Sequence, residues 1–174
     1  LKDRYAAAHL RVAFIQQEKG DPTAARTAYQ EAFARYDEVL AGQPGDRAAL
    51  LDVARGRHRL GDLQAATKGE REGARHSYQQ AVGILEPLAA DDPDAQALLA
   101  RVHQSLAAWH KPESTDAALA HTRQALELRQ RVAAARPADA RARRELAAGF
   151  TDLAILENQA RRLNEAAAAY EAAS

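Results

Sequence analysis

Six histidines are the side chains of this 174-residue sequence that have the chemistry to bind a metal ion or to transfer a proton near neutral pH. They form no His-Glu-x-x-His motif. No two of them lie three or four residues apart, the spacing that places two imidazoles on one helical face. The chain also has no cysteine, which excludes thiol catalysis and cysteine-bound zinc. The sequence therefore predicts no metal site and no cofactor. The six residues are His9, His58, His76, His103, His110 and His121.

Motifs for phosphate transfer and nucleophilic catalysis are missing as well. The stretch GDLQAATKGE (61–70) has some likeness to a phosphate-binding loop, but its Lys68-Gly69 order is the reverse of the order that such a loop needs. The chain has neither the His-Arg-Asp nor the Asp-Phe-Gly motif of a kinase. Ser114 is better placed to cap a helix that begins near Thr115 than to act as a nucleophile. We therefore expect a protein that is not an enzyme.

The composition indicates closely packed helices. Apolar residues make up 47% of the chain but aromatic residues only 5%, and alanine, which has the highest helix propensity, supplies much of the apolar content. No segment shows the alternating, β-branched pattern of a strand. The 24 basic residues balance the 24 acidic ones, and no apolar run approaches the ~20 residues that span a bilayer. We expect an all-α fold that neither binds nucleic acid nor inserts into a membrane.

A five-position signature occurs four times, every 46 to 48 residues, and indicates an amphipathic helix at the start of each repeat. Its members share one helical face because they lie three, four and seven residues apart. Each copy consists of an adjacent pair, a single residue and a second adjacent pair. The four copies are Tyr5-Ala6, His9, Val12-Ala13; Val53-Ala54, Arg57, Leu60-Gly61; Leu99-Ala100, His103, Leu106-Ala107; and Leu146-Ala147, Phe150, Leu153-Ala154.

A second helix follows each copy and carries two alanines with a larger residue between them. We expect the alanines to permit close approach of neighbouring helices and the aromatic residue to fill the space between them. In the first three repeats this helix is expected to run to a proline twelve residues beyond the last alanine, because proline cannot continue a helix. The sets are Ala25, Tyr29, Ala32; Ala74, Tyr78, Ala81; Ala118, Thr122, Ala125; and Ala166, Tyr170, Ala173, and the prolines are Pro44, Pro93 and Pro137.

Turn residues separate the predicted helices. In GDP (20–22) glycine ends one helix, aspartate caps the next and proline takes its first position, while PGD (44–46) and PAD (137–139) each offer an aspartate cap. HKPEST (110–115) lacks glycine and comes early, so we expect the preceding helix to end sooner. An extra residue before KGEREG predicts a longer turn there. We expect one domain, 1–174, with repeats at about 3–45, 46–94, 95–138 and 139–174.

This pattern resembles the tetratricopeptide repeat, whose helix pairs carry Leu-Gly or Leu-Ala, a glycine turn and then Ala…Tyr…Ala…Pro. The resemblance extends from about Tyr5 to the end of the chain. The repeats are longer than the usual 34 residues, and His9, Arg57 and His103 replace the early aromatic residue. The resemblance implies a right-handed superhelical solenoid of about four antiparallel helix pairs, whose first helices form a concave face that binds protein segments.

The segment HRLGDLQAATKGEREGARHSYQQAVGILEPLAADDPDA (58–95) is also similar to the C-terminal repeat region of bacterial membrane-anchored serine/threonine kinases. This resemblance implies the sensor or docking region of a larger signalling protein, located in the periplasm. Without such an anchor the expected compartment is the cytoplasm, and the sequence leaves the choice open. Because the chain contains no methionine, not even an initiator, we expect a fragment of a longer protein.

The first helices supply the predicted binding residues. If the geometry of the family holds, basic residues lie at the centre of the groove and apolar residues at its ends. Guanidinium groups bind carboxylates through paired hydrogen bonds, so we expect an acidic or carboxylate-bearing protein segment to bind there. The alternative is that these basic residues only hydrate an exposed helix. The predicted groove residues are Leu10, Phe14, Gln17, Arg55, His58, Arg101, Gln104, Lys111, Thr151, Ile155 and Asn158.

A second hypothesis concerns self-assembly. The final predicted helix, AAAAYEAAS (166–174), is apolar and is not followed by a polar capping helix in this sequence. Such an end can pair with the same end of another copy. The alternative function is therefore a structural scaffold that forms a homodimer through the ends of the solenoid. Alternatively, the next helix of a longer protein follows this end.

Overall fold

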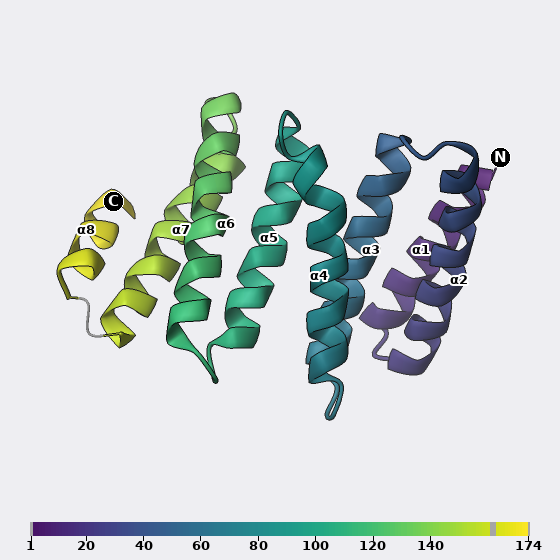
Figure 1. Cartoon of the computed structure of the whole chain (residues 1–174), viewed down its shortest axis with the longest axis horizontal. Coiled ribbons are helices and arrows are strands. Elements are labelled where there is room, and N and C mark those ends of the chain that lie inside the picture. The colour runs from purple at the N-terminus through teal and green to yellow at the C-terminus, as the bar shows by residue number, and fades with distance from the viewer. Residues whose placement is uncertain (1, 161–162, 174) are drawn as a thin grey trace. The chain divides into compact units, whose positions relative to one another are not determined.

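The computed structural model describes residues 2–160 and 163–173, and the regular structure within these ranges is entirely helical. The helices pair in chain order: α1 packs on α2, α5 on α6 and α7 on α8, and a hydrogen bond from Tyr78 to Asp62 joins α4 to α3. Figure 1 shows the order of the helices along the chain. The predicted all-α fold of four helix pairs is confirmed. No described helix is both long and apolar enough to cross a membrane. The helices are α1 (Lys2–Glu18), α2 (Pro22–Gly42), α3 (Arg47–Ala65), α4 (Arg71–Leu88), α5 (Pro93–His110), α6 (Thr115–Ala135), α7 (Ala140–Gln159) and α8 (Leu163–Ala173).

The predicted caps are present. Asp21 accepts a hydrogen bond from the backbone N–H of Ala24 at 2.9 Å, Gly20 has a φ of 76°, and α2 begins at Pro22. The Asp46, Ser114 and Asp139 side chains cap α3, α6 and α7 in the same way. Each cap satisfies a backbone donor that the first turn of a helix leaves without an intrahelical acceptor. These residues therefore define where the helices begin.

The prediction for Pro93 is wrong. Helix α4 ends at Leu88, and Pro93 is the first residue of α5 instead of the stop of the preceding helix. Pro87 already lies in the last turn of α4, where it lacks the N–H that would continue the hydrogen-bond pattern. Asp92 accepts hydrogen bonds from the N–H groups of Asp94 and Ala95, and this cap starts α5.

The predicted irregular turns are confirmed. The turn between α3 and α4 spans 66–70, which is longer than the turn before α2, and contains Gly69 with a φ of 85°. Such a φ favours glycine because other residues carry a Cβ that collides with the backbone. Helix α5 ends at His110, earlier relative to its signature than α1 does.

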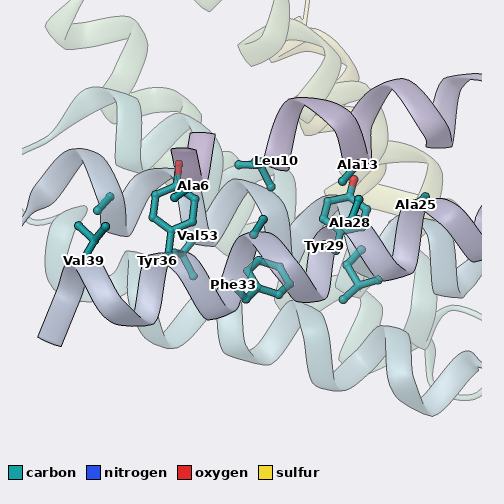
Figure 2. Packing of buried hydrophobic residues seen from close by; sticks show 13 residues of the cluster. Ala6, Leu10, Ala13, Ala25, Ala28, Tyr29, Phe33, Tyr36, Val39 and Val53 are labelled. Carbon is teal, nitrogen blue, oxygen red and sulfur yellow. The ribbon is translucent and has the colours of Figure 1, made fainter. Parts of the chain in front are cut away.

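The chain divides into two compact units, Leu1–Leu85 and Glu86–Ser174, with the boundary inside α4. In the N-terminal unit, aromatic side chains of α2 form the centre of the core, as Figure 2 shows. Tyr29 stacks on Phe33 with ring centroids 6.1 Å apart, and Phe14 of α1 meets Tyr29 edge-on at 6.0 Å. The Tyr36 hydroxyl donates a hydrogen bond to the Asp52 carboxylate of α3 at 2.9 Å. The large rings thus connect α1, α2 and α3.

The C-terminal unit has a mainly aliphatic core. Val102 and Leu106 of α5 are buried, as are Leu119 and Leu126 of α6, and Trp109 of α5 is its buried tryptophan. Leu156 of α7 packs against Leu119 and the neighbouring alanine. Between α6 and α7 the same helix-pair architecture is therefore filled with aliphatic side chains.

Two glycines at equivalent repeat positions allow close helix approach. Both lie three residues after the start of the signature, Gly56 in α3 and Gly149 in α7. A Cβ on Gly56 would lie 2.9 Å from the Phe33 ring, and one on Gly149 would lie 2.9 Å from the guanidinium of Arg129. Real Cβ atoms do not approach neighbours that closely. Each glycine therefore makes room for a large side chain of the preceding helix.

Candidate functional site

The candidate site is a pocket of about 230 Å³ on the C-terminal unit. It lies between α5 and α7, and residues of α6 complete its lining. Clefts of this kind are the usual location of ligand contacts because they surround a guest group on several sides. The lining residues are Gln104, Ala107 and Ala108 of α5, Lys111 directly after it, Thr122, Ala125 and Arg129 of α6, and Asp152, Ile155 and Leu156 of α7.

The bottom of the pocket is made of small and apolar groups. Ala107, Ala125 and Leu156 are buried, and the buried Thr122 hydroxyl donates to the carbonyl of Ala118 at 2.9 Å. Because this hydroxyl is already bonded within its own helix, Thr122 presents mainly its methyl group and its small volume. The bottom of the pocket therefore suits an apolar part of a guest.

Polar groups gather on one wall. The Arg129 guanidinium, which is 8% exposed, donates to the Gln104 side-chain carbonyl at 2.6 Å and lies 3.5 Å from the Asp152 carboxylate. The Gln104 amide in turn donates to Asp152 at 3.0 Å. The three side chains form a closed polar network that connects α5, α6 and α7. This network holds a buried cation beside the pocket, where Asp152 compensates its charge.

The rim carries a second cation and an exposed apolar group. Lys111 is exposed in the turn directly after α5, and among the described residues no carboxylate is recorded within ion-pair distance of its ammonium group. Ile155 of α7 is 40% exposed, which is high for a large apolar residue in this chain. The pocket therefore combines a positive edge, an apolar edge and a small apolar bottom.

The repeat explains why this pocket is open. Thr122 occupies the repeat position of Tyr29, and Ala108 occupies that of Phe14. In the N-terminal unit, Phe14 and Tyr29 are packed against each other in the space between α1, α2 and α3. Replacing two rings by a hydroxyl-bearing and a methyl side chain leaves volume that no neighbour fills. The pocket is thus the volume of two missing aromatic rings.

The closed counterpart in the N-terminal unit is also covered from outside. The Tyr29 hydroxyl donates to the Gln17 side-chain carbonyl at 2.6 Å, and the Arg59 guanidinium lies over the Phe14 ring at 5.3 Å from its centroid. Burial raises the pKa of the Tyr29 hydroxyl well above its usual value, so this group stays neutral. The position of Arg59 corresponds to that of Asp152 in the open pocket.

The predicted groove residues of α1 do not form an open surface. In contrast to the prediction, Leu10 is buried (3% exposed), since the absence of a side chain at Gly56 lets it pack into the core. Phe14 is half-buried and packs against the core, and Gln17 accepts the hydrogen bond from Tyr29. These contacts leave less of Leu10 and Phe14 available to a partner, and binding of an apolar residue near Phe14 stays a prediction.

The predicted basic residues of α3 are already paired. Arg55 lies 2.6 Å from the Asp52 carboxylate, one turn earlier in the same helix. His58 is half-buried, with its ring 3.7 Å from the Asp62 carboxylate. The neighbouring carboxylates weaken the positive potential that we expected to attract an acidic segment. This agrees with the alternative that these basic residues only hydrate an exposed helix. Arg101 is exposed on α5 and belongs to the other unit, and its role stays a prediction.

Three of the predicted residues do come together. Gln104, Lys111 and Ile155 line the same pocket, as their repeat offsets on α5 and α7 predicted. Thr151 is half-buried and donates to the carbonyl of Ala147, while Asn158 is exposed outside the pocket lining. Three of the predicted residues therefore line one pocket, on the C-terminal unit. Whether that surface binds a partner stays a prediction.

The sequence prediction did not include three pocket residues. Arg129 and Thr122 lie on α6, a second helix, and Asp152 lies on α7, a first helix, beside the predicted Thr151. Arg129 of the third repeat occupies the position of Tyr36 in the first repeat. A position-by-position comparison of the repeats would therefore have shown that a basic residue replaces an aromatic one. Residues of a second helix were not considered as ligand contacts.

A histidine cluster was also missed. His103 of α5 and His121 of α6 approach with their Nδ1 atoms 3.1 Å apart, and the His110 ring stacks on His121 at 5.2 Å. Burial, together with the neighbouring His121, lowers the pKa of His103 from its ordinary 6.5 to about 4. Burial and His110 also lower the pKa of His121, which contacts Gln124 as well. His103 and His110 lie two turns apart on α5, and His121 lies on α6. A search for local sequence motifs does not connect residues at such separations.

The histidine cluster does not form a metal centre. Within residues 2–160 and 163–173, no three side chains of the ligating types are arranged to hold a metal ion. The His110 and His121 rings are instead stacked, with an angle of 20° between their planes. Packing and tautomer-dependent hydrogen bonding account for the arrangement.

Comparisons with known proteins bear on the fold. No protein-family model and no curated protein matches the sequence. Among solved structures, the chain is similar to BtubC (BKLC) from P. vanneervenii, with a TM-score of 0.74 and 18% identity over 99% of this chain. The chain spans 63% of the length of that protein. It is also similar to the de novo designed helical repeat protein DHR64, with a TM-score of 0.57 and 21% identity over 99% of this chain and 91% of the other. At these identities the similarity shows a shared helical-repeat fold.

Proposed function

We propose that this chain is a non-catalytic protein-interaction module whose pocket on the C-terminal unit binds a carboxylate-bearing segment of a partner. Helical repeats commonly serve as interaction scaffolds, because stacked helix pairs bury a core and leave extended helix faces exposed. The observation that carries the proposal is the pocket itself, in which a buried arginine and an exposed lysine flank a small apolar bottom.

The chemistry of the pocket favours a carboxylate over other polar groups. Arg129 has five N–H donors, and its contacts with Gln104 and Asp152 engage only part of them. Lys111 adds a mobile ammonium group at the rim. A guest carboxylate is attracted by both cations, while Asp152 repels it and so requires the guest to approach from the side of Lys111.

Ile155 supports the choice of a peptide segment over a small anion. Its exposed side chain borders the pocket opposite α5, and it offers an apolar contact to residues that flank the guest carboxylate. Burying such a group against a partner contributes about 1 to 2 kcal/mol. A small anion would leave this contact unused.

The parent protein is proposed from the sequence resemblance alone. The likeness of 58–95 to the repeat region of membrane-anchored kinases suggests the sensor or docking part of a bacterial signalling protein. In that case the module lies in the periplasm. In a parent protein without a membrane anchor it lies in the cytoplasm.

A displayed library of random peptides tests the binding proposal. The immobilised wild-type chain is expected to enrich peptides that carry aspartate, glutamate or a free C-terminal carboxylate next to an apolar residue. The Lys111→Ala and Thr122→Tyr variants are expected to lose this enrichment, because one lacks the rim cation and the other fills the bottom. Lys68→Ala, an exposed lysine in the turn before α4, serves as the matched control and should enrich the same peptides as wild type.

Two results would overturn the proposal. The first is a wild-type chain that enriches no acidic peptides. The second is a set of acidic peptides that bind Thr122→Tyr as well as wild type, which would move the binding surface away from the pocket. Circular dichroism of each variant must show wild-type helix content for either result to count.

A further inference from the structure

The pocket on the C-terminal unit lies where two other repeats hold a phenol ring. Tyr29 of α2 and Tyr78 of α4 occupy the repeat position of Thr122, and they are 0% and 2% exposed. Figure 2 shows Tyr29 among the buried side chains of its core. The Tyr78 ring lies against Gly61 of α3, whose counterpart in the pocket is Ala107. The packing of the first two repeats is therefore built around an aromatic ring at this position.

The first two repeats also provide a hydrogen-bond acceptor for the phenol hydroxyl. Tyr29 donates to the Gln17 side-chain carbonyl at 2.6 Å, and Tyr78 donates to the Asp62 carboxylate at 2.9 Å. Both acceptors come from the first helix of the same repeat. A buried hydroxyl needs such an acceptor, because an unsatisfied polar group in the interior is costly. The ring and the acceptor thus form one packing unit.

The third repeat changes both parts of this unit. Thr122 has no ring. Lys111 stands at the position of Gln17 in the first repeat, and Ala108 stands at the position of Asp62 in the second. An ammonium group donates hydrogen bonds and cannot accept them, and a methyl group does neither. The pocket therefore has space for a ring and, beside that space, a cation in place of an acceptor. A guest that fills it must bring both the ring and an acceptor of negative charge.

The size and lining of the pocket agree with an aromatic guest. Its volume is about 230 Å³, and an apolar cavity of about 150 Å³ is large enough to bind benzene. Ala107, Ala125 and Leu156 line it and are buried, so a ring at the bottom meets apolar groups. The remaining volume accommodates the atoms that join the ring to its carboxylate.

The position of the cations determines how the ring enters. Arg129 already contacts Gln104 and Asp152, so Lys111 at the rim is the cation that we expect a carboxylate to reach first. Thr122 lies at the bottom, where its hydroxyl is bonded within its own helix. The ring of the guest therefore points inward and its carboxylate stays at the rim.

This arrangement favours a chain terminus over an internal acidic residue. In a C-terminal residue the side chain and the terminal carboxylate are attached to the same Cα, so both fit into one pocket. In an extended internal segment, successive side chains point to opposite sides. The carboxylate of an aspartate or glutamate next to the ring is then directed away from the pocket.

We propose that the guest is the C-terminal phenylalanine of a partner protein, with its ring above Thr122 and its terminal carboxylate at Lys111. The inference rests on the proposed function and specifies which residue carries the carboxylate. Phenylalanine has no polar group on its ring, and the apolar bottom of the pocket favours such a ring because a polar group buried there would lose its hydration.

NMR titration of the isotope-labelled 174-residue chain with three peptides tests the guest. The peptides begin with Ser-Gly-Ser-Gly and end in phenylalanine, in alanine, or in phenylalanine with an amidated terminus. The phenylalanine acid should bind about 10- to 100-fold more tightly than the alanine acid, because its ring leaves water. It should also bind about tenfold more tightly than the amide, which lacks the charge that Lys111 attracts. The ring current should displace the methyl signals of Thr122 and Leu156 only with the phenylalanine peptides.

Two variants separate the ring from the carboxylate. Ala108→Phe changes an exposed residue and restores the ring that Phe14 supplies in the first repeat, so it should abolish the preference for phenylalanine over alanine. Lys111→Gln restores the residue of the first repeat and should weaken both acids by the same factor, which keeps the preference. Lys68→Ala is the control and should bind all three peptides as wild type does. Circular dichroism must show wild-type helix content for each variant.

Four results would overturn this inference. If the alanine acid binds as tightly as the phenylalanine acid, the proposed function stands and the aromatic guest is wrong. If the phenylalanine amide binds as tightly as the acid, neither the terminal carboxylate nor the proposed function holds. If an amidated peptide with an internal Phe-Asp pair binds as tightly as the phenylalanine acid, the carboxylate comes from a side chain. If no peptide binds at about 10 mM, the C-terminal guest is wrong, and the displayed library decides separately on the proposed function.

Discussion

In the N-terminal unit, Phe14 and Tyr29 fill the space between α1, α2 and α3, whereas in the C-terminal unit Ala108 and Thr122 stand at the same repeat positions and leave a pocket between α5, α6 and α7. Both units use the same helix pairs, an aspartate cap at the start of α3 and of α7, and the same glycine position in these two helices. Two substitutions in the interior thus convert a closed core into a cleft. A repeat can acquire a binding site through side-chain volume alone, without a change in its backbone plan.

The two units also differ in the charged residues at equivalent repeat positions. Arg129 replaces Tyr36, and Asp152 replaces Arg59, so the open unit carries an ion pair between a buried arginine and a partly exposed aspartate where the closed one carries an aromatic ring and an exterior guanidinium. Such a pair adds little to stability, because desolvation of the buried partner offsets the attraction. We therefore expect the polar wall to contribute little to the stability of the unit.

The largest expected effect comes from opening the closed unit. Tyr29→Thr places the residue of the open unit in the N-terminal core and should lower the free energy of unfolding by about 3 to 5 kcal/mol, since it leaves a cavity and removes the hydrogen bond to Gln17. Urea denaturation measures this loss. Tyr170→Thr, the same exchange at the exposed equivalent position, should cost under about 0.5 kcal/mol. Equal costs at the two positions would show that Tyr29 does not fill the core as described.

Acid should destabilise the C-terminal unit through His103. Because the pKa of His103 falls from 6.5 to about 4 on folding, the unfolded chain takes up a proton before the folded chain does. The stability contributed by neutral His103 is thus fully present above pH 6.5. As the pH falls from 6.5 to 4 it decreases by about 3 kcal/mol, and it is constant below that range. Urea midpoints measured across this range should show the slope.

Removing the imidazole should remove this dependence. His103→Gln is expected to flatten the profile between pH 6.5 and 4, while His76→Gln, an exchange of an exposed histidine on α4, should leave it unchanged. A profile that stays as steep in His103→Gln would assign the acid sensitivity to other groups. The adjacent His121 and His110 are the first candidates for such groups.

The equivalent glycines should differ in their tolerance of alanine. A Cβ on Gly56 meets the Phe33 ring, which is held by its neighbours, and Gly56→Ala should cost about 1 to 3 kcal/mol. A Cβ on Gly149 meets the end of the Arg129 side chain, which can shift, so the cost there should be lower. Gly83→Ala, with no atom near the added Cβ, should stabilise the helix by about 0.5 to 1 kcal/mol. Thermal unfolding of the three variants would contradict the account if Gly149 proved the less tolerant site.

The smallest effect is expected from closing the open unit. Thr122→Tyr restores the residue of the closed unit, and the pocket of about 230 Å³ gives the ring space. The free energy of unfolding should change by less than about 1 kcal/mol, in contrast to the reverse exchange at Tyr29. A loss of several kcal/mol in urea denaturation would mean that the volume at Thr122 is not accessible to a ring.

Much of the fold was predictable because its determinants are local. The aspartate caps and the Ala-aromatic-Ala spacing act within one or two helical turns, so the repeated sequence predicted the four helix pairs. Pro93 was misassigned because a proline can either follow the end of a helix or take the first position of the next one. Pro87 near the end of α4 and the Asp92 cap before α5 together identify the second case.

The site was predictable only in part. The positions of Gln104, Lys111 and Ile155 follow from the periodicity of the first helices. The burial of Leu10 in α1 depends on α3, where Gly56 has no side chain and leaves room for it. The network of Arg129 with Asp152, and the contact of His103 with His121, likewise join residues that only tertiary packing brings together. Volume at equivalent repeat positions was the signal in the sequence that would have located the pocket.

The central claim is that the volume freed at Thr122 is a binding site, and calorimetric titration of one peptide tests it most directly. A peptide enriched by the wild-type chain would be titrated into wild type, Thr122→Tyr and Lys68→Ala. The account predicts that Thr122→Tyr, with its helix content and stability unchanged, weakens binding at least tenfold, while Lys68→Ala binds as wild type does. Equal affinity of the peptide for Thr122→Tyr and wild type would contradict the account, because the ring would then occupy the pocket without displacing the guest.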